Sequence, residues 1–166
     1  RWVSGTYDAS MGETDLQQPD APALMPRVAR LSDDLLAFAE TPREVMLLDD
    51  AGVPLRGGDL DRRFFEAAWV HRHDGRYYFS YSTGDTHTIA YATGDSPYGP
   101  FTHRGVVLTP VQGWTTHHSI VEADGRWWLF YHDTELSDRT HLRSAKVAEL
   151  VHEADGRIRT IDPFVR

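Results

Sequence analysis

The stretch RFFEAAWVHRHDGRYYFSYS, residues 63–82, decides the fold of this chain. Two runs rich in aromatic and β-branched residues flank the dipeptide Asp74-Gly75. Such runs around Asp-Gly are the strongest short-range signal for a β-hairpin, because a type I′ turn needs positive φ at both central residues. The first run also carries a carboxylate, Glu66, among aromatic side chains.

The same pattern returns about fifty residues later. Residues 69–81, WVHRHDGRYYFSY, align with residues 119–131, SIVEADGRWWLFY, and Asp124-Gly125 takes the place of the first turn. A hairpin that recurs every 40–50 residues or so is typical of the blades of a β-propeller. We therefore expect an all-β fold built from consecutive blades.

Alternating runs predict further strands on either side of these hairpins. We expect them at residues 27–31, 44–48, 86–93, 101–108, 116–122, 126–132 and 141–147. A third Asp-Gly, at residues 155–156, predicts a hairpin that joins residues 147–152 to 158–161. The run 33–38 has an acidic start that suits one helical turn, and no long helix is expected.

Bulk composition narrows the function classes. The chain has 166 residues, of which 40% are hydrophobic, so it can fold around a real core. It contains no cysteine, which excludes disulfides and thiolate chemistry. The net charge of −8 disfavours nucleic acid as a partner, and no apolar run approaches the ~18 residues of a membrane span. No signal or transit peptide is visible at the start, which leaves cytoplasmic and secreted locations both open.

The repeat register brings two polar groups together. When the two Asp-Gly turns are superposed, Glu66 falls opposite Thr116, with His117 one position further on. Equivalent positions in neighbouring blades point at the same axial channel, so we expect Glu66 and residues 115–119 to share one cavity. Glu66 is then either a general acid, its pKa raised by apolar surroundings, or a carboxylate that only pairs with an arginine such as Arg63.

Other polar candidates have competing structural interpretations. His117 and His118 cannot both face one ligand on a regular strand, because adjacent residues point to opposite sides. His71 and His73 share a face with a spacing compatible with a metal site, but no third ligand is evident, so we expect exposed strand residues. Arg143 either clamps a hydroxyl or carboxylate of a ligand or pairs within its blade.

Aromatic side chains are expected to form mostly core between the sheets. They include Tyr77, Tyr78, Trp127 and Trp128. Trp114, beside Gly113 in a loop, is the best candidate for stacking on a sugar ring. Trp69, in the same aromatic stretch as Glu66, is a further candidate for contact with substrate.

Five segments carry a resemblance to glycoside hydrolase family 43, the five-bladed propeller enzymes that include β-xylosidases, α-L-arabinofuranosidases and arabinanases. They are RFFEAAW (63–69), YYFSYSTGDTHTIAYATGDSPYGPF (77–101), GWTTHHSIVE (113–122), WWLFYHD (127–133) and THLRSAKV (140–147). The likeness runs from about residue 21 to residue 161. It implies an inverting glycosidase that acts on xylose- or arabinose-containing oligosaccharides and polysaccharides.

The resemblance also implies roles for single residues. Glu66 matches the general acid, Arg143 the arginine that contacts the sugar in the −1 subsite, and His117 the histidine that helps hold a hydrated calcium ion. Family members usually have Gly-Pro after the acid, whereas Ala67-Ala68 follow here. The general base and a second, tuning carboxylate belong to the first two blades of such enzymes, and neither has a matching position in this sequence.

We therefore expect a partial propeller of about three blades over residues 1–166. Residues 1–62 would hold the end of one blade, a long loop and part of the next. Residues 63–110 would form the blade with Glu66, and residues 111–166 the last blade. Since propellers generally close with four to eight blades, a preceding segment, a second copy or a separate N-terminal chain would complete the ring. Alone, the chain is expected to be inactive; a non-catalytic carbohydrate-binding or scaffold role is the alternative.

Overall fold

The computed structural model describes residues 18–114 and 116–165. Residues 1–17, within the segment expected to hold the end of one blade and a long loop, lie outside these ranges. The strands of the described part are β1 (Arg27–Val28), β2 (Arg43–Glu44), β3 (Leu47–Leu48), β4 (Glu66–His73), β5 (Arg76–Ser82), β6 (Ile89–Gly94), β7 (Phe101–Leu108), β8 (Ser119–Ala123), β9 (Arg126–Asp133) and β10 (Ser144–Leu150). Across these residues there is no helix, and so none long and apolar enough to cross a membrane.

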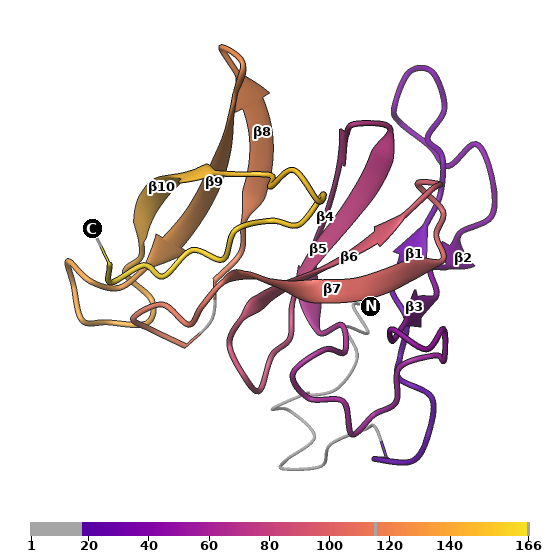
Figure 1. The fold of residues 1–166 in the computed structure, drawn as a ribbon, viewed down its shortest axis with the longest axis horizontal. Helices are drawn as coiled ribbons and strands as arrows, with labels where there is room; N and C mark the ends of the chain where they lie inside the picture. The colour runs from indigo at the N-terminus through magenta and orange to yellow at the C-terminus, as the bar shows by residue number, and fades with distance from the viewer. Residues whose placement is uncertain (1–17, 115, 166) are drawn as a thin grey trace.

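Two curled sheets lie side by side (Figure 1). The larger has the strand order β3-β7-β6-β5-β4, and the smaller has the order β10-β9-β8. β4, β5, β6 and β7 pair antiparallel in chain order, and so do β8, β9 and β10. β3 pairs with β7 in parallel. β4 and β8, the first strands of the two sequence repeats, are edge strands and contact each other. The short pair β1-β2 forms a third sheet.

The first two of the three predicted Asp-Gly hairpins are confirmed. The φ angles are 46° and 79° at Asp74 and Gly75, and 53° and 72° at Asp124 and Gly125. Positive φ at both central residues is the signature of the type I′ turn, whose twist matches that of the flanking strands. The sequence repeat therefore corresponds to a structural repeat.

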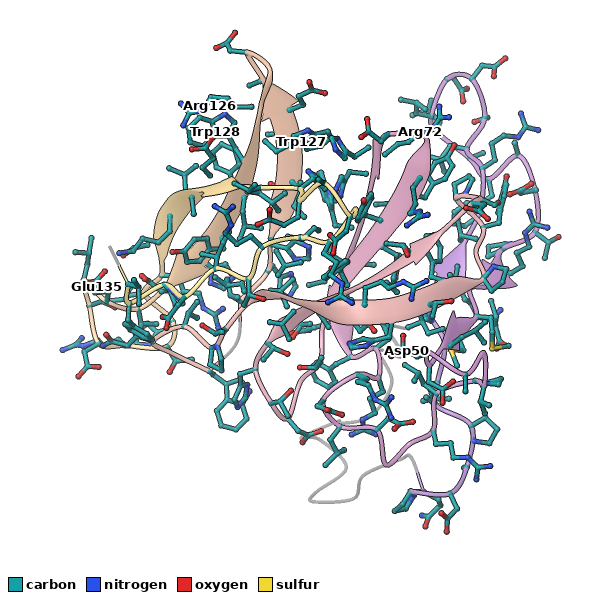
Figure 2. All side chains as sticks on the ribbon, in the orientation of Figure 1. Asp50, Arg72, Arg126, Trp127, Trp128 and Glu135 are labelled. Atoms are coloured by element: carbon teal, nitrogen blue, oxygen red, sulfur yellow. The ribbon has the colours of Figure 1, made fainter. Side chains whose placement is uncertain are left out.

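Two apolar clusters form the core. The first packs on one face of the five-stranded sheet and includes Phe79, Tyr81 and Phe101. The second lies between the two sheets and includes Tyr78 and Leu129, with Trp127 packed against it. Figure 2 shows Trp127 and Trp128 on opposite sides of the β8–β9 hairpin, with Trp127 directed toward the larger sheet. Of the aromatic residues expected in the core, Trp128 instead lies under the guanidinium of Arg126, 4.6 Å from its ring centroid.

The helical turn expected over residues 33–38 is wrong. Leu35 adopts a φ of 62°, outside the helical region, and the Ser32 hydroxyl accepts a hydrogen bond from the backbone N–H of Ala37 at 3.1 Å. The Asp34 carboxylate accepts another from the backbone N–H of Leu36 at 3.1 Å. Short polar side chains thus close a tight loop, a known alternative to helix for Ser and Asp.

The chain after β10 also differs from expectation. The hairpin predicted around residues 155–156 has a single isolated bridge, between His152 and Ile158, instead of two paired strands. Ile161 pairs in parallel with Leu108 of β7. The segment therefore crosses from the smaller sheet to the larger one, as the yellow trace in Figure 1 shows, and does not fold back on its own blade.

Candidate active site

Glu66 begins β4, the edge strand of the larger sheet that contacts β8. The β4–β5 ladder shifts register between Glu66 and Trp69, and Ala67 has a φ of 59°. Such a bulge adds a residue to one strand, bends it and re-aims the side chains beside it. Ala67, where family members usually carry glycine, thus takes a left-handed conformation that glycine would adopt without strain.

Glu66 and His117 meet, as the repeat register predicts. Oε1 of Glu66 lies 3.3 Å from Nε2 of His117, and the two side chains are 23% and 54% exposed. The hydrogen bond to Glu66 raises the pKa of His117 above its ordinary value, against the opposing effect of burial. Arg63, the alternative partner considered for Glu66, forms an ion pair with Asp85 at 2.9 Å.

His117 and His118 point to different surroundings, as expected. Nε2 of His118 lies 2.6 Å from the Ser80 hydroxyl of β5, on the larger sheet. Burial lowers the pKa of His118 to about 3, so this imidazole is neutral at physiological pH. The predicted strand over 116–122 begins only at Ser119, so the two histidines lie in the connection that leads into β8.

His132 of β9 contacts both His117 and Arg143, and the sequence analysis assigned it no role. Its Nε2 accepts a hydrogen bond from the backbone N–H of His117 at 3.0 Å, and the backbone N–H of His132 donates to the Thr116 hydroxyl at 3.0 Å. Burial, followed by the charge of Arg143, lowers its pKa. The antiparallel pairing of β9 and β10 places His132 opposite Ala145, two positions from Arg143, a register that no local sequence signal gave.

Arg143 immediately precedes β10, whereas the sequence placed it within a strand. Its Nε donates to the carbonyl of Thr140 at 2.9 Å, and its Nη1 lies 3.2 Å from Nδ1 and 3.3 Å from Nε2 of His132. The guanidinium is thus fixed beside a neutral imidazole that also holds the backbone of His117. The carboxylate therefore comes from β4, the imidazole of His117 from the connection into β8, and the guanidinium from the residue just before β10.

The two tryptophans expected to contact substrate occupy different environments. Trp114 is 63% exposed in its loop, and its ring meets the ring of His87 edge-on, with 5.0 Å between centroids. Trp69 is half-buried, and its indole N–H donates to the carbonyl of Ile120 in β8 at 3.0 Å. Trp69 therefore ties the two sheets together, while Trp114 presents an open face.

His71 and His73 were expected to be exposed, and this is wrong for His71. Its side chain is buried, with 8% of the residue exposed, and its Nε2 lies 3.0 Å from Nε2 of His152. His73 stacks on His152 with 4.0 Å between ring centroids. Their shared face was inferred correctly, but His152 reaches it from more than eighty positions away, which strand spacing alone could not reveal.

The donor set does not make a metal centre by itself. Over residues 18–114 and 116–165, no group of three or more His, Cys, Asp or Glu side chains is arranged to hold a metal ion. Calcium prefers six to eight oxygen ligands. His117 offers one nitrogen, which already faces Glu66. The described residues therefore do not fit a calcium ion held by direct protein ligands.

Comparison with known proteins agrees with this geometry. The sequence pattern of Glycosyl hydrolases family 43 matches residues 27–158. A protein named xylosidase/arabinosidase from Bacteroides ovatus is 61% identical over 148 residues, which cover 89% of this chain and 46% of that protein. A β-xylosidase from Xylanibacter ruminicola is 60% identical over 136 residues, which cover 81% of this chain and 42% of that protein.

Solved structures give the same result. A β-xylosidase/α-arabinofuranosidase from a compost microbial metagenome, crystallised with xylotriose in a calcium-free form, superposes with a TM-score of 0.90 at 62% identity. The match covers 93% of this chain and 47% of that one. An enzyme from Xanthomonas citri, solved with xylose, superposes with a TM-score of 0.89 at 59% identity, covering 93% of this chain and 47% of its own.

The two sheets and their match to solved structures define an all-β protein of the propeller type. The chain belongs to Glycosyl hydrolases family 43. It spans about half the length of the relatives it matches.

Proposed function

We propose that this chain is the acid-bearing part of an inverting glycoside hydrolase that acts on xylose- or arabinose-containing oligosaccharides. The observation that carries the proposal is the approach of Glu66 to His117 across two sheets, with Arg143 joined to the same network through His132. The names of the relatives, xylosidase/arabinosidase and β-xylosidase, support the substrate class.

In the proposed reaction, Glu66 gives its proton to the leaving glycosidic oxygen, and a base-activated water attacks the opposite face of the sugar. Inversion needs the acid and base about 6.5–9.5 Å apart, with that water between them. When His117 is protonated, its contact with Glu66 favours the carboxylate form, so in the proposed reaction Glu66 acts as an acid with this contact broken. Arg143 would orient the sugar by donating hydrogen bonds to its hydroxyls. No step is assigned to calcium, and the water-mediated contact of His117 with such an ion stays a prediction.

We further propose that another part of a family 43 propeller completes the site, and that it packs on the outer face of the smaller sheet. We define this outer face as Val121, Trp128, Phe130 and Val147. Phe130 pairs with Val147 across the β9–β10 ladder, and the two residues are 45% and 55% exposed. Leu129, on the other face of β9, is fully buried. An exposed patch of this kind is typical of an interaction surface.

Activity assays test both proposals. The chain alone should not hydrolyse 4-nitrophenyl β-xyloside or α-L-arabinofuranoside. A chimera that joins it to the unmatched N-terminal part of the Bacteroides ovatus relative should hydrolyse at least one of them, and Glu66→Gln should abolish this. Turnover by the chain alone that is lost on Glu66→Gln contradicts the missing base. A folded chimera that binds xylotriose without turnover favours the non-catalytic carbohydrate-binding alternative, for which the open face of Trp114 is the supporting observation.

A further inference from the structure

The two sheets are joined outside the candidate site by a segment that we call the strap, residues 151–161. It leaves β10 and runs across to the larger sheet (Figure 1). Residues in the middle of the strap form hydrogen bonds with β5 and β6. The Tyr78 hydroxyl of β5 donates to the carbonyl of Gly156 at 2.8 Å, and the N–H of Ile158 donates to the Tyr91 hydroxyl of β6 at 3.0 Å. Its end bonds to β7, where the N–H of Ile161 donates to the carbonyl of Val107 at 2.8 Å.

A cluster of three imidazoles lies where the strap first meets the larger sheet. His71 and His73 come from β4, and His152 comes from the strap. The ring of His71 also lies 5.0 Å from that of Trp127 and 4.9 Å from that of Tyr78, centroid to centroid. The cluster is thus built from both sheets and the strap, and the rings around it are aromatic.

The contact between His71 and His152 has room for one proton only. Their Nε2 atoms lie 3.0 Å apart, which fits one N–H donor facing one lone pair. In the part of the chain that the structure describes, Nδ1 of each ring is buried without a hydrogen-bond partner. In the neutral pair the donor ring carries its proton at Nε2 and the acceptor ring carries its proton at Nδ1. A third proton, which makes one ring cationic, must therefore set two N–H groups against each other at the contact or add a second N–H at a buried Nδ1 without a partner. Either arrangement costs free energy, because a buried charge without a partner is unfavourable.

The surrounding groups do little to offset that charge. Those facing the pair are His73 of β4, Asp74 of the turn that follows it, and His118 from the connection into β8. Tyr78 of β5 stacks on His71, and Arg76 and Asp155 act on Tyr78. Burial, followed by the neighbouring histidines, lowers the pKa of His71 to about 3. Burial, followed by His73, lowers the pKa of His152 to about 4, and Asp74 opposes this only in part.

We propose that the His71–His152 pair is a pH-sensitive clasp, which holds the middle of the strap on the larger sheet when neutral and releases it when protonated. Only the middle of the strap should respond. Its end is held by backbone bonds and by the hydroxyl of Thr160, which donates to the carbonyl of Val106 at 2.9 Å. These bonds involve no titratable side chain. The clasp also joins the sheets that carry Glu66 and His117, so its release loosens the frame of the candidate site.

Amide hydrogen exchange tests the clasp. The reporters in the middle of the strap are the N–H groups of Glu153, Ile158 and Arg159, bonded to Arg157, Tyr91 and Val151, and the reference in its end is the N–H of Ile161. In the open state both histidines titrate near pH 6.5, so opening becomes more favourable below that pH. Between pH 7 and pH 4.5, protection of the reporters, corrected for intrinsic exchange, should fall at least tenfold more than that of Ile161.

Two variants distinguish the effect of the histidines from that of the other ionisable groups of the strap, which include Glu153 and Asp155. His152→Gln keeps a polar group near the position of Nε2 but cannot be protonated, so the acid-induced loss should shrink to less than threefold. His141→Gln, which removes an exposed histidine elsewhere, should leave that loss unchanged. Equal losses in wild type and His152→Gln overturn the proposal, as does a loss shared equally by Ile161. If His152→Gln does not fold, NMR titration of the wild-type rings decides: titration of His71 and His152 near pH 6.5 in the folded chain overturns it.

Discussion

Oε1 of Glu66 lies 3.3 Å from Nε2 of His117, although about fifty residues separate them in the chain. Each residue lies near the start of an edge strand, β4 or β8, and these strands belong to the two copies of the sequence repeat. The contact thus follows from the repeat, because equivalent ends of neighbouring blades converge. The protonation state of Glu66, the candidate general acid, is therefore linked to that of the imidazole of His117.

Replacing Glu66 should lower the pKa of His117. The hydrogen bond to Glu66 is the main cause of the raised pKa, so Glu66→Gln should bring it to its ordinary value or below. Because the pair favours protonated His117, its stabilisation is present below pH 6.5 and is lost as the pH rises through the raised pKa. NMR titration of the ring measures this. Glu122→Gln, which changes an exposed carboxylate of β8, is the control, and a His117 pKa unchanged by Glu66→Gln contradicts the prediction.

A glycine at position 67 should stabilise the chain. Ala67 has a φ of 59°, a conformation that costs a non-glycine residue about 1–2 kcal/mol. Ala67→Gly should therefore raise the free energy of unfolding by about 0.5–1 kcal/mol, after allowing for the greater entropy of glycine in the unfolded chain. Urea denaturation measures the change.

The matched control is the next residue. Ala68→Gly, in the same strand but without positive φ, should lower the free energy of unfolding by about 0.5–1 kcal/mol. Equal destabilisation by the two variants would show that the left-handed conformation at Ala67 carries no strain.

Local sequence signals predicted the hairpins and the first contact of the site because these depend on short-range chemistry. Asp-Gly specifies a turn by its backbone freedom, and the turn fixes the register of the strands it joins. The repeat register placed Glu66 near His117. The different direction of His118 was expected from alternation along a strand, and it is observed although both histidines precede β8. Phe101–Leu108, expected as a strand from its alternation, is β7.

The remaining features depend on segments that meet without a repeat to relate them. His152 reaches His71 only because the strap crosses between sheets, and a hairpin signal at residues 155–156 cannot indicate which sheet receives it. Arg143 was assigned to a strand, but it lies just before β10, held by the carbonyl of Thr140. The role of His132 rests on contacts with residues from two other elements. Contacts of this kind are set by packing and not by local propensity.

Removing the indole N–H of Trp69 should weaken the junction of the two sheets. That group donates to the carbonyl of Ile120 at 3.0 Å, and Trp69→Phe leaves the carbonyl without this donor. A hydrogen bond of this type contributes about 0.5–1.5 kcal/mol, and the smaller ring loses further apolar contact, so we expect a loss of about 1–3 kcal/mol. Trp128→Phe, on the outer face, should cost less than half as much by urea denaturation. A smaller loss for Trp69→Phe than for Trp128→Phe contradicts the proposed junction.

The free energy of unfolding should fall as the solution becomes acidic, in part because of His118. Burial lowers its pKa to about 3, so below pH 6.5 the unfolded chain binds a proton at this residue that the folded chain does not. The group therefore destabilises the fold progressively as the pH falls from 6.5 toward 3, by at most about 1.4 kcal/mol per pH unit. His118→Gln keeps a partner for the Ser80 hydroxyl without the titration. Urea denaturation at pH 7, 6, 5 and 4.5 should give a shallower decline for this variant, and parallel declines for variant and wild type would exclude His118 as a source of the acid sensitivity.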